Sequence, residues 1–162
     1  MEKINVDQLE HLRISVNVYL LLVEDKLGRE VKPDEIEVAL GVELGKFLNH
    51  FPKEFKFWRF GNMKEVDKKA ALDELADCIN FMNMLQGNMK YCSSILYGSI
   101  DKELNIYNYY KLILSEDTSF SFRMSLIINL GFKFGFTWEE IYEATLNKIA
   151  IINERLNNET ER

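Results

Sequence analysis

The chain has 162 residues, of which 47% are hydrophobic and 28% are charged, a composition typical of a soluble globular protein. This length predicts a single domain, residues 1–162, that can bury a sizeable core. The net charge of −6 argues against nucleic acid as a partner, and no apolar run is long enough to cross a bilayer. Because the N-terminal sequence lacks the character of a signal peptide, we expect a cytoplasmic protein.

Two helices are predicted in the first third of the chain. The first extends from about Val6 to Leu27, where apolar residues recur at helical spacing on one face. The second begins at Pro33, a residue that suits a helix start, and the acids that follow suit the positive end of the helix dipole. It continues to about Asn49, and Pro52 is expected to end it.

The segment from Pro52 to Met63 is rich in aromatic and basic side chains outside any helical period. So much aromatic surface needs a partner. It either packs onto the bundle or across a subunit interface, or forms a flap that stacks on a base and contacts phosphate. The side chains concerned are Lys53, Phe55, Lys56, Phe57, Trp58, Arg59 and Phe60.

A third helix, from about Lys64 to Lys90, carries two acids on an apolar face. Glu74 and Asp77 are one turn apart and therefore point to the same side of the helix. Glu43, on the second helix, has similar apolar neighbours. Ionised carboxylates on a packed face are costly unless a cation pairs with them, and oxygen ligands suit Mg²⁺. The three acids therefore predict a magnesium site, and a solvated acidic face is the alternative.

The second half of the chain predicts three further helices. Thr137 and Glu140 form a capping box at the start of the last one, and Gly135 stops the helix before it. Gly98 and Ser99 are expected to form a turn, and the tail after Asn157 is expected to fray. The predicted ranges are Leu104–Leu114, about Ser119–Phe134, and Thr137 to about Asn157.

Taken together, these elements predict an all-α helical bundle with a four-helix core. No stretch shows strand-like alternation over a useful length. Cys78 and Cys92 lack disulfide or zinc-site spacing, and both are interpreted as buried free thiols. One acidic bundle offers little space for core, so a homodimer is expected.

The stretches ALGVELGKFLNHFPKEFKFW (39–58) and AALDELADCINF (70–81) resemble the dimeric all-α dUTPases of phage and Gram-positive bacteria. These enzymes belong to the all-α nucleoside triphosphate pyrophosphohydrolases, which also include the MazG-like enzymes. The family carries Glu-x-x-Glu on one helix, an aromatic and lysine-bearing run ending in Trp, and Glu-x-x-Asp on the next helix. Glu43, the run from Phe55 to Trp58, and the pair Glu74 and Asp77 match this pattern. The resemblance extends from about Glu37 to Arg155.

The resemblance implies hydrolysis of dUTP to dUMP and pyrophosphate with Mg²⁺, in a homodimer. Glu43, Glu74 and Asp77 would be both the catalytic residues and the metal ligands. The implied substrate-binding residues are Lys56, Trp58, Asn80, Lys148 and Arg155.

Several of these positions have a second interpretation. A polar residue on the family's first helix helps to read uracil, and Asn17 is either that residue or a helix-surface asparagine. Asn80 is a nucleotide contact or an ordinary buried amide, and Lys148 and Arg155 are phosphate ligands or the charged outer end of a helix.

Lys46 stands where the family has the second Glu of its first motif. Its ammonium could pair with Glu43 or Asp77 and take the place of one metal ion, extend into solvent, or bind substrate phosphate. Two alternative functions follow: a catalytically degenerate relative that binds nucleotide or protein, and a MazG-like pyrophosphatase of other nucleotides.

Overall fold

The computed structural model describes residues 2–61, 65–96 and 104–160, and all regular structure in these ranges is helical. Among the described helices, none combines the length and apolar composition that a membrane crossing requires. The expected turn at Gly98 and Ser99 lies outside the described residues. The helices are α1 (Val6–Leu27), α2 (Pro33–Asn49), α3 (Pro52–Phe55), α4 (Lys68–Gln86), α5 (Ser93–Leu96), α6 (Ile106–Ile113), α7 (Phe120–Lys133) and α8 (Trp138–Thr160).

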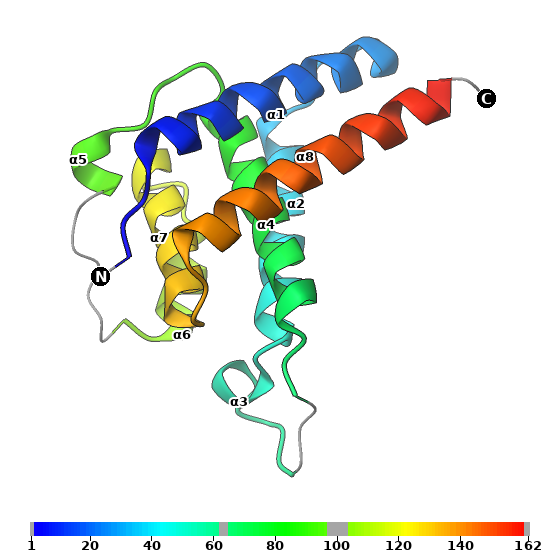
Figure 1. Cartoon of the computed structure of the whole chain (residues 1–162). Helices are drawn as coiled ribbons and strands as arrows, with labels where there is room; N and C mark the ends of the chain where they lie inside the picture. The colour runs from blue at the N-terminus through cyan, green and yellow to red at the C-terminus, as the bar shows by residue number, and fades with distance from the viewer. Residues whose placement is uncertain (1, 62–64, 97–103, 161–162) are drawn as a thin grey trace.

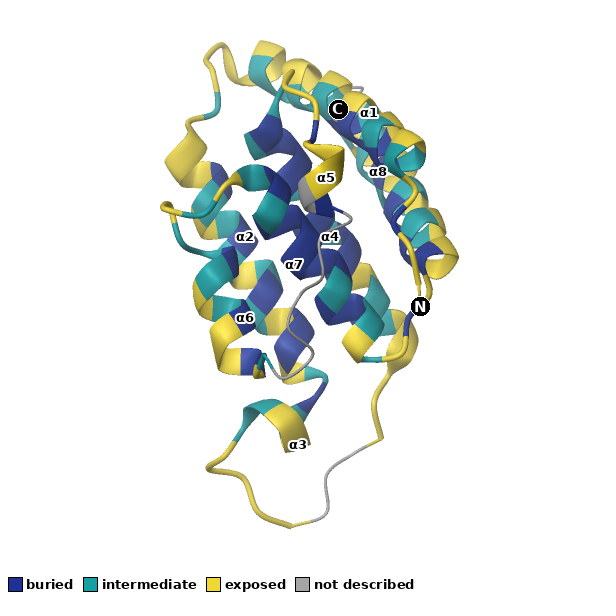
Figure 2. Cartoon of the chain, turned by 90° about the vertical axis from the view of Figure 1, so that its left-hand side faces the viewer, coloured by how far each residue is buried: buried dark blue, intermediate teal, exposed yellow. Residues whose placement is uncertain are grey.

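Helix α4 is the centre of the bundle, in contact with α1, α2, α7 and α8 (Figure 1). It begins at Asp67, whose carboxylate accepts a hydrogen bond from the Ala70 N–H, and it ends at Gly87, where φ is +59°. Its apolar side chains are spread around the helix rather than confined to one stripe, as a central helix requires. Figure 2 shows α4 and α7 largely in the colour of buried residues. The fully buried side chains of α4 include Ala71, Leu75, Cys78, Ile79 and Met82.

Helices α4, α7 and α8 meet closely at Gly131. A Cβ atom at this position would lie 2.7 Å from Leu75 Cδ2 and 2.9 Å from Ile141 Cδ1. A Cβ atom here would force the ends of the Leu75 and Ile141 side chains to shift, so glycine suits the close packing at this point. Helix α7 thus packs against both α4 and α8, and α8 carries Lys148, one of the predicted substrate-binding residues.

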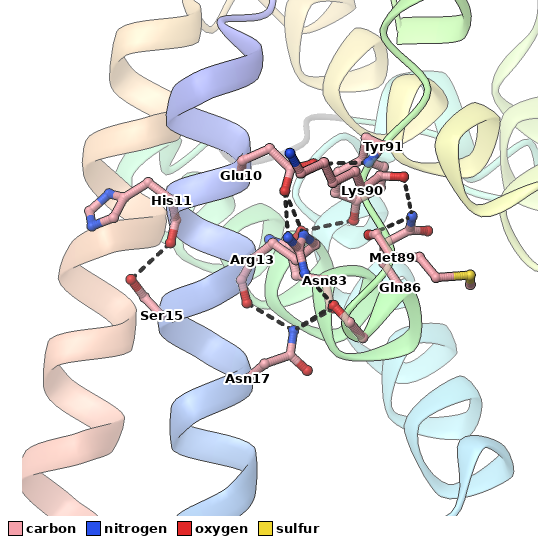
Figure 3. Close-up of polar contacts among 11 residues, drawn as sticks. Glu10, His11, Arg13, Ser15, Asn17, Asn83, Gln86, Met89, Lys90 and Tyr91 are labelled. Atoms are coloured by element: carbon pink, nitrogen blue, oxygen red, sulfur yellow. Dashed lines mark hydrogen bonds and ion pairs between the residues drawn. The ribbon is translucent and has the colours of Figure 1, made fainter.

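A buried polar network joins the first half of α1 to the end of α4 (Figure 3). The guanidinium of Arg13 forms an ion pair with Glu10 at 2.6 Å and donates a hydrogen bond to the Gly87 carbonyl at 2.6 Å. Glu10 in turn accepts from the Tyr91 N–H, and the Tyr91 hydroxyl donates to Asn83 Oδ1 at 2.8 Å. Because most polar groups of this network have partners, its role is to hold α1 on α4.

Asn17 belongs to the same junction. Its Nδ2 donates to the carbonyls of Arg13 at 2.8 Å and Asn83 at 3.0 Å (Figure 3). The side chain is half-buried between α1 and α4, so the interpretation as a helix-surface asparagine is wrong. The amide nitrogen satisfies carbonyl groups near the end of α4.

The predicted helix boundaries agree well with the structure where a cap was recognised. The bounds of α1 and α2 are those predicted, and the capping box is confirmed by hydrogen bonds between Thr137 and Glu140. Other boundaries were wrong. The third predicted helix is shorter at both ends, the segment after Pro52 contains a helical turn, and the last helix continues through Asn157 to Thr160.

Candidate metal centre

Helices α2 and α4 lie side by side and bring three acids together (Figure 1). Carboxylate oxygens of Glu43, Glu74 and Asp77 lie within 4.8 Å of one another, and all three residues are half-buried. Glu43 follows the buried Leu40 on α2, while Glu74 and Asp77 flank the buried Leu75 on α4. The helices turn their apolar positions to the core and leave these acids at the edge of the interface. The structure thus brings together the three residues predicted to form a metal site.

Two lysines approach this cluster from different helices. Lys46 Nζ, one turn along α2, contacts both carboxylate oxygens of Glu43 at 2.8 and 3.0 Å. Lys148 Nζ, on α8, contacts Asp77 at 2.8 Å and Asp73 at 2.6 Å. The side chain of Lys148 is 14% exposed and that of Lys46 is 51% exposed. Lys148 is therefore held within the structure, whereas Lys46 reaches the cluster from its solvent side.

The proximity of the acids shifts their ionisation. Burial, a hydrogen bond with Glu43 and the Glu43 charge raise the pKa of Glu74 to about 7. Burial also raises the pKa of Asp77, and the Lys148 ammonium opposes this shift. The hydrogen bond to Glu43 raises the pKa of Lys46, with smaller contributions from the charges of Glu74 and Asp77. The two lysines therefore leave part of the negative charge uncompensated.

Cys78 lies beside the acids on α4 and is fully buried. Burial raises the pKa of its thiol well above the ordinary value, so the thiol stays protonated and apolar in character. The second cysteine differs from the prediction: Cys92 is exposed, because it lies in the connection just before α5 rather than inside a helix.

Asn80 follows Asp77 by one turn on α4 and is 2% exposed. Both Asn80 Nδ2 and Oδ1 are buried with no hydrogen-bond partner in the described part of the chain. Leaving a buried amide unpaired costs about 1–3 kcal/mol for each group. Such a side chain calls for a partner, a ligand or a water molecule, that the described residues do not supply.

Lys56 caps the C-terminus of α3, and Trp58 follows it in the connection toward α4. Helix α3 extends beyond the ends of α2 and α4 (Figure 1). The ring of Trp58 contacts those of Phe55 and Phe57, and the side chain is 55% exposed. Phe55 also packs against Tyr107 of α6, so part of the aromatic segment rests on the bundle as the first interpretation proposed.

Arg155 is exposed on α8, seven residues after Lys148 and therefore roughly 10 Å farther along the helix axis. An open groove of about 860 Å³ lies between α4 and α8, with Asp73, Lys148 and Asn147 among its lining residues. Lys148 thus lines this groove and also contacts Asp77 of the acidic cluster. Arg155 is not among the lining residues of the groove.

Asp73 is a further residue of the candidate site that the sequence analysis missed. Its carboxylate holds the other side of the Lys148 ammonium, so it helps to fix the position of that lysine. The signal was available: Asp73 lies four residues before Asp77, and residues at this spacing share a helix face. It was hidden because the same pattern is common on solvated helix faces.

The donor set of the cluster is chemically suited to a hard divalent cation. All three candidate ligands are carboxylates, which Mg²⁺ and Mn²⁺ favour over the nitrogen and sulfur ligands preferred by softer metals. The raised pKa of Glu74 is consistent with this, since a bound cation would favour the ionised form that burial and the neighbouring Glu43 disfavour. The oxygens are also close enough together to share one ion.

A family model described as dUTPase matches residues 22–159. The chain belongs to the all-α dUTPase family. The match includes the three acids and both lysines of the cluster but leaves out most of α1, with Asn17. dUTPases are hydrolases of nucleotide metabolism that generally use a divalent metal ion. A comparison with curated proteins found no match.

Proposed function

We propose that this dUTPase family member is a Mg²⁺-dependent dUTP diphosphatase, which hydrolyses dUTP to dUMP and pyrophosphate. The observation that carries the proposal is the convergence of Glu43, Glu74 and Asp77 from two helices. Three acids within 4.8 Å of one another are unfavourable in a protein that has no use for a cation. Their presence in a chain of this family supports a catalytic metal site.

In this proposal Glu43, Glu74 and Asp77 hold the metal ion. When bound, Mg²⁺ would neutralise phosphate charge and lower the pKa of an attacking water molecule. The acids must be ionised for this purpose, so metal binding releases the proton that Glu74 carries near neutral pH. Their positions on two packed helices keep the ligands preorganised.

Lys148 is the best-supported phosphate ligand of the proposal. Its ammonium lies 2.8 Å from Asp77, so a phosphate close to the metal ligands is also close to this lysine. Lys56 and Arg155 extend from the periphery and are proposed to contact the outer phosphates. They are exposed or half-buried, and reaching a bound nucleotide requires them to move toward it.

Base recognition is assigned to Asn80 and Trp58. The amide of Asn80 offers one acceptor and two donors, which complement the N3–H and a flanking carbonyl of uracil. No described residue pairs with these buried atoms, and a bound base would supply partners for them. Trp58 is exposed on the segment before α4 and offers a ring on which the base can stack.

We further propose that residues 1–162 form one domain and that this domain associates as a homodimer. Helix α4 contacts helices from both halves of the chain, which supports a single domain. Helix α1 exposes an apolar row, Ile14, Val18, Leu21 and Leu22, whose sequence spacing places them on one face. Single apolar residues on a protein surface are common, but a contiguous row of four is typical of an interaction surface. Light scattering over a dilution series at micromolar concentration should give twice the chain mass, and a monomer throughout would contradict the dimer.

Pyrophosphate release from each nucleoside triphosphate, with and without Mg²⁺, tests the enzymatic proposal. We expect hydrolysis of dUTP that depends on Mg²⁺ and is lost in Glu74→Gln. Preference for a different nucleotide would support the MazG-like alternative. Binding of dUTP without hydrolysis would support the binding-module alternative and overturn the proposed reaction.

A further inference from the structure

Lys46 occupies an unusual place in the cluster. Its ammonium contacts both carboxylate oxygens of Glu43, at 2.8 and 3.0 Å, so neither oxygen is without a cationic partner. Glu43 is the inner partner, with a side chain 14% exposed, while Lys46 is 51% exposed. A cation approaching Glu43 from solvent meets this ammonium first.

The charges around the cluster favour a single added ion. Four carboxylates lie in the connected set: the three candidate ligands and Asp73, which shares Lys148 with Asp77. Two ammonium groups, Lys46 and Lys148, oppose them. Two negative charges remain when all four acids are ionised, which one divalent cation neutralises. A second divalent cation would bring a net positive charge into a half-buried site.

We propose that the Lys46 ammonium is a resident cation of the Glu43, Glu74 and Asp77 cluster, which limits it to one divalent ion when no nucleotide is bound. This inference rests on the proposed metal site. In this inference Lys46 positions the Glu43 carboxylate and competes with metal ions for it, and does not contact the reacting atoms. Because Lys46 reaches the cluster from solvent, its ammonium can be displaced without disturbing the packing of α2 on α4.

Isothermal titration of the metal-free protein with MgCl₂, repeated with MnCl₂, tests this inference. Three variants are compared with the parent. Lys46→Met keeps an unbranched stem without charge, and Lys46→Glu adds a possible ligand. Lys111→Glu is the matched control, since it makes the same charge change at an exposed position on α6. Circular dichroism verifies that each variant is folded.

We expect the parent and Lys111→Glu to bind one ion per chain with similar affinity. Lys46→Met should bind one ion about fivefold more tightly, since it loses a partly exposed ion pair that competes with the metal. Lys46→Glu should bind two ions per chain. If Lys46→Glu does not fold, the affinity of Lys46→Met decides the question alone.

Two ions per chain in the parent, or Lys46→Met with unchanged affinity, would overturn the role of Lys46 and leave the metal site intact. An equal gain in Lys111→Glu and Lys46→Glu would also overturn it, because the effect would then be one of net charge alone. Absence of metal binding in the parent and all variants would instead remove the metal site itself.

Discussion

Glu37 and Glu43 lie on the same helix, and the protein compensates their charges in different ways. Glu37 receives a two-pronged contact from Arg123 of α7, with oxygen to nitrogen distances of 2.7 and 2.5 Å. The side chain of Arg123 is 1% exposed, and its guanidinium also donates to the Ile113 carbonyl. Glu43 instead lies beside two further acids, and its own ammonium partner is half exposed.

The difference separates a structural ion pair from the candidate metal site. In the first region the guanidinium of Arg123 pairs with both oxygens of Glu37. A buried ion pair needs such contacts to offset the cost of removing its charges from water. In the second region like charges remain together, and the pKa of Glu74 is raised to about 7 because burial and Glu43 disfavour its ionised form. Unfavourable electrostatic interactions of this kind are typical of functional sites, where binding of a ligand relieves them. The comparison predicts opposite responses to loss of charge.

The largest effect is expected at the structural pair. Arg123→Met leaves Glu37 without its partner beside an apolar core and should lower the free energy of unfolding by about 3 kcal/mol or more. Urea denaturation measures this change. The double variant with Glu37→Met should recover most of the loss, because the stranded charge is then gone. If the free energy of unfolding of Arg123→Met falls by less than about 1 kcal/mol, the Glu37 carboxylate is instead hydrated in the variant.

A smaller change of opposite sign is expected in the cluster. Glu74→Gln removes one of three like charges and should stabilise the metal-free protein by about 1 kcal/mol, after allowance for solvent screening. The same variant should lose the rise in Tm that Mg²⁺ produces in the parent. Asp77→Asn is the control. It should abolish the response to Mg²⁺ and stabilise the metal-free protein less than Glu74→Gln does, because Lys148 loses a charged partner although burial raises the pKa of Asp77.

These expectations combine sequence patterns with contacts that only the structure supplies. The bounds of α1 were predictable because its apolar residues recur at helical spacing, and the start of α2 because Pro33 is a strong local signal. The meeting of Glu43 with Glu74 and Asp77 was predictable because apolar neighbours on both helices implied packing. In each case the information lies within a few residues of the chain.

What escaped prediction depends on the relative placement of distant helices. The ion pair of Lys148 with Asp73 and Asp77 joins residues about 70 positions apart, and nothing local to α8 specifies it. The sequence also left open which way Lys46 points, since a lysine stem can turn to solvent or back along its helix. The exposure of Cys92 was missed because apolar neighbours suggested a helix where a connection lies.

The cluster should also make the stability of the metal-free protein depend on pH. Its raised pKa means that Glu74 binds a proton at higher pH in the folded protein than in the unfolded chain, whose value is near 4.5. Protonation therefore favours the fold, and stability should rise as pH falls from 8 through 7 and level off near 4.5. Asp77 acts in the same direction. Glu35, with a pKa lowered to about 2 by Arg29, opposes this only below about pH 4.5.

Thermal unfolding in EDTA at pH 6 and pH 8 measures this dependence. The parent should have the higher Tm at pH 6, and Glu74→Gln should reduce the difference. Equal values in the parent at the two pH values would mean that the Glu74 carboxyl is not perturbed. The measurement thus tests the raised pKa of Glu74 separately from metal binding.

The smallest effect on stability is expected at Asn80. Asn80→Leu replaces unpaired buried amide atoms with an apolar group of similar size, so the free energy of unfolding should stay within about 0.5 kcal/mol of the parent or rise. Asn83→Leu is the contrasting variant. It removes the acceptor of the buried Tyr91 hydroxyl and should cost about 1–3 kcal/mol. A large loss in Asn80→Leu would reveal a structural partner and argue against base recognition.

The most direct test of the central claim is anomalous diffraction from crystals grown with Mn²⁺ and a non-hydrolysable dUTP analogue. We expect a manganese peak bounded by the carboxylates of Glu43, Glu74 and Asp77, with the analogue's phosphates beside it. Glu74→Gln crystals grown in the same way should lose that peak. A manganese peak elsewhere on the protein, or none at the three acids while the analogue is bound, would contradict the account.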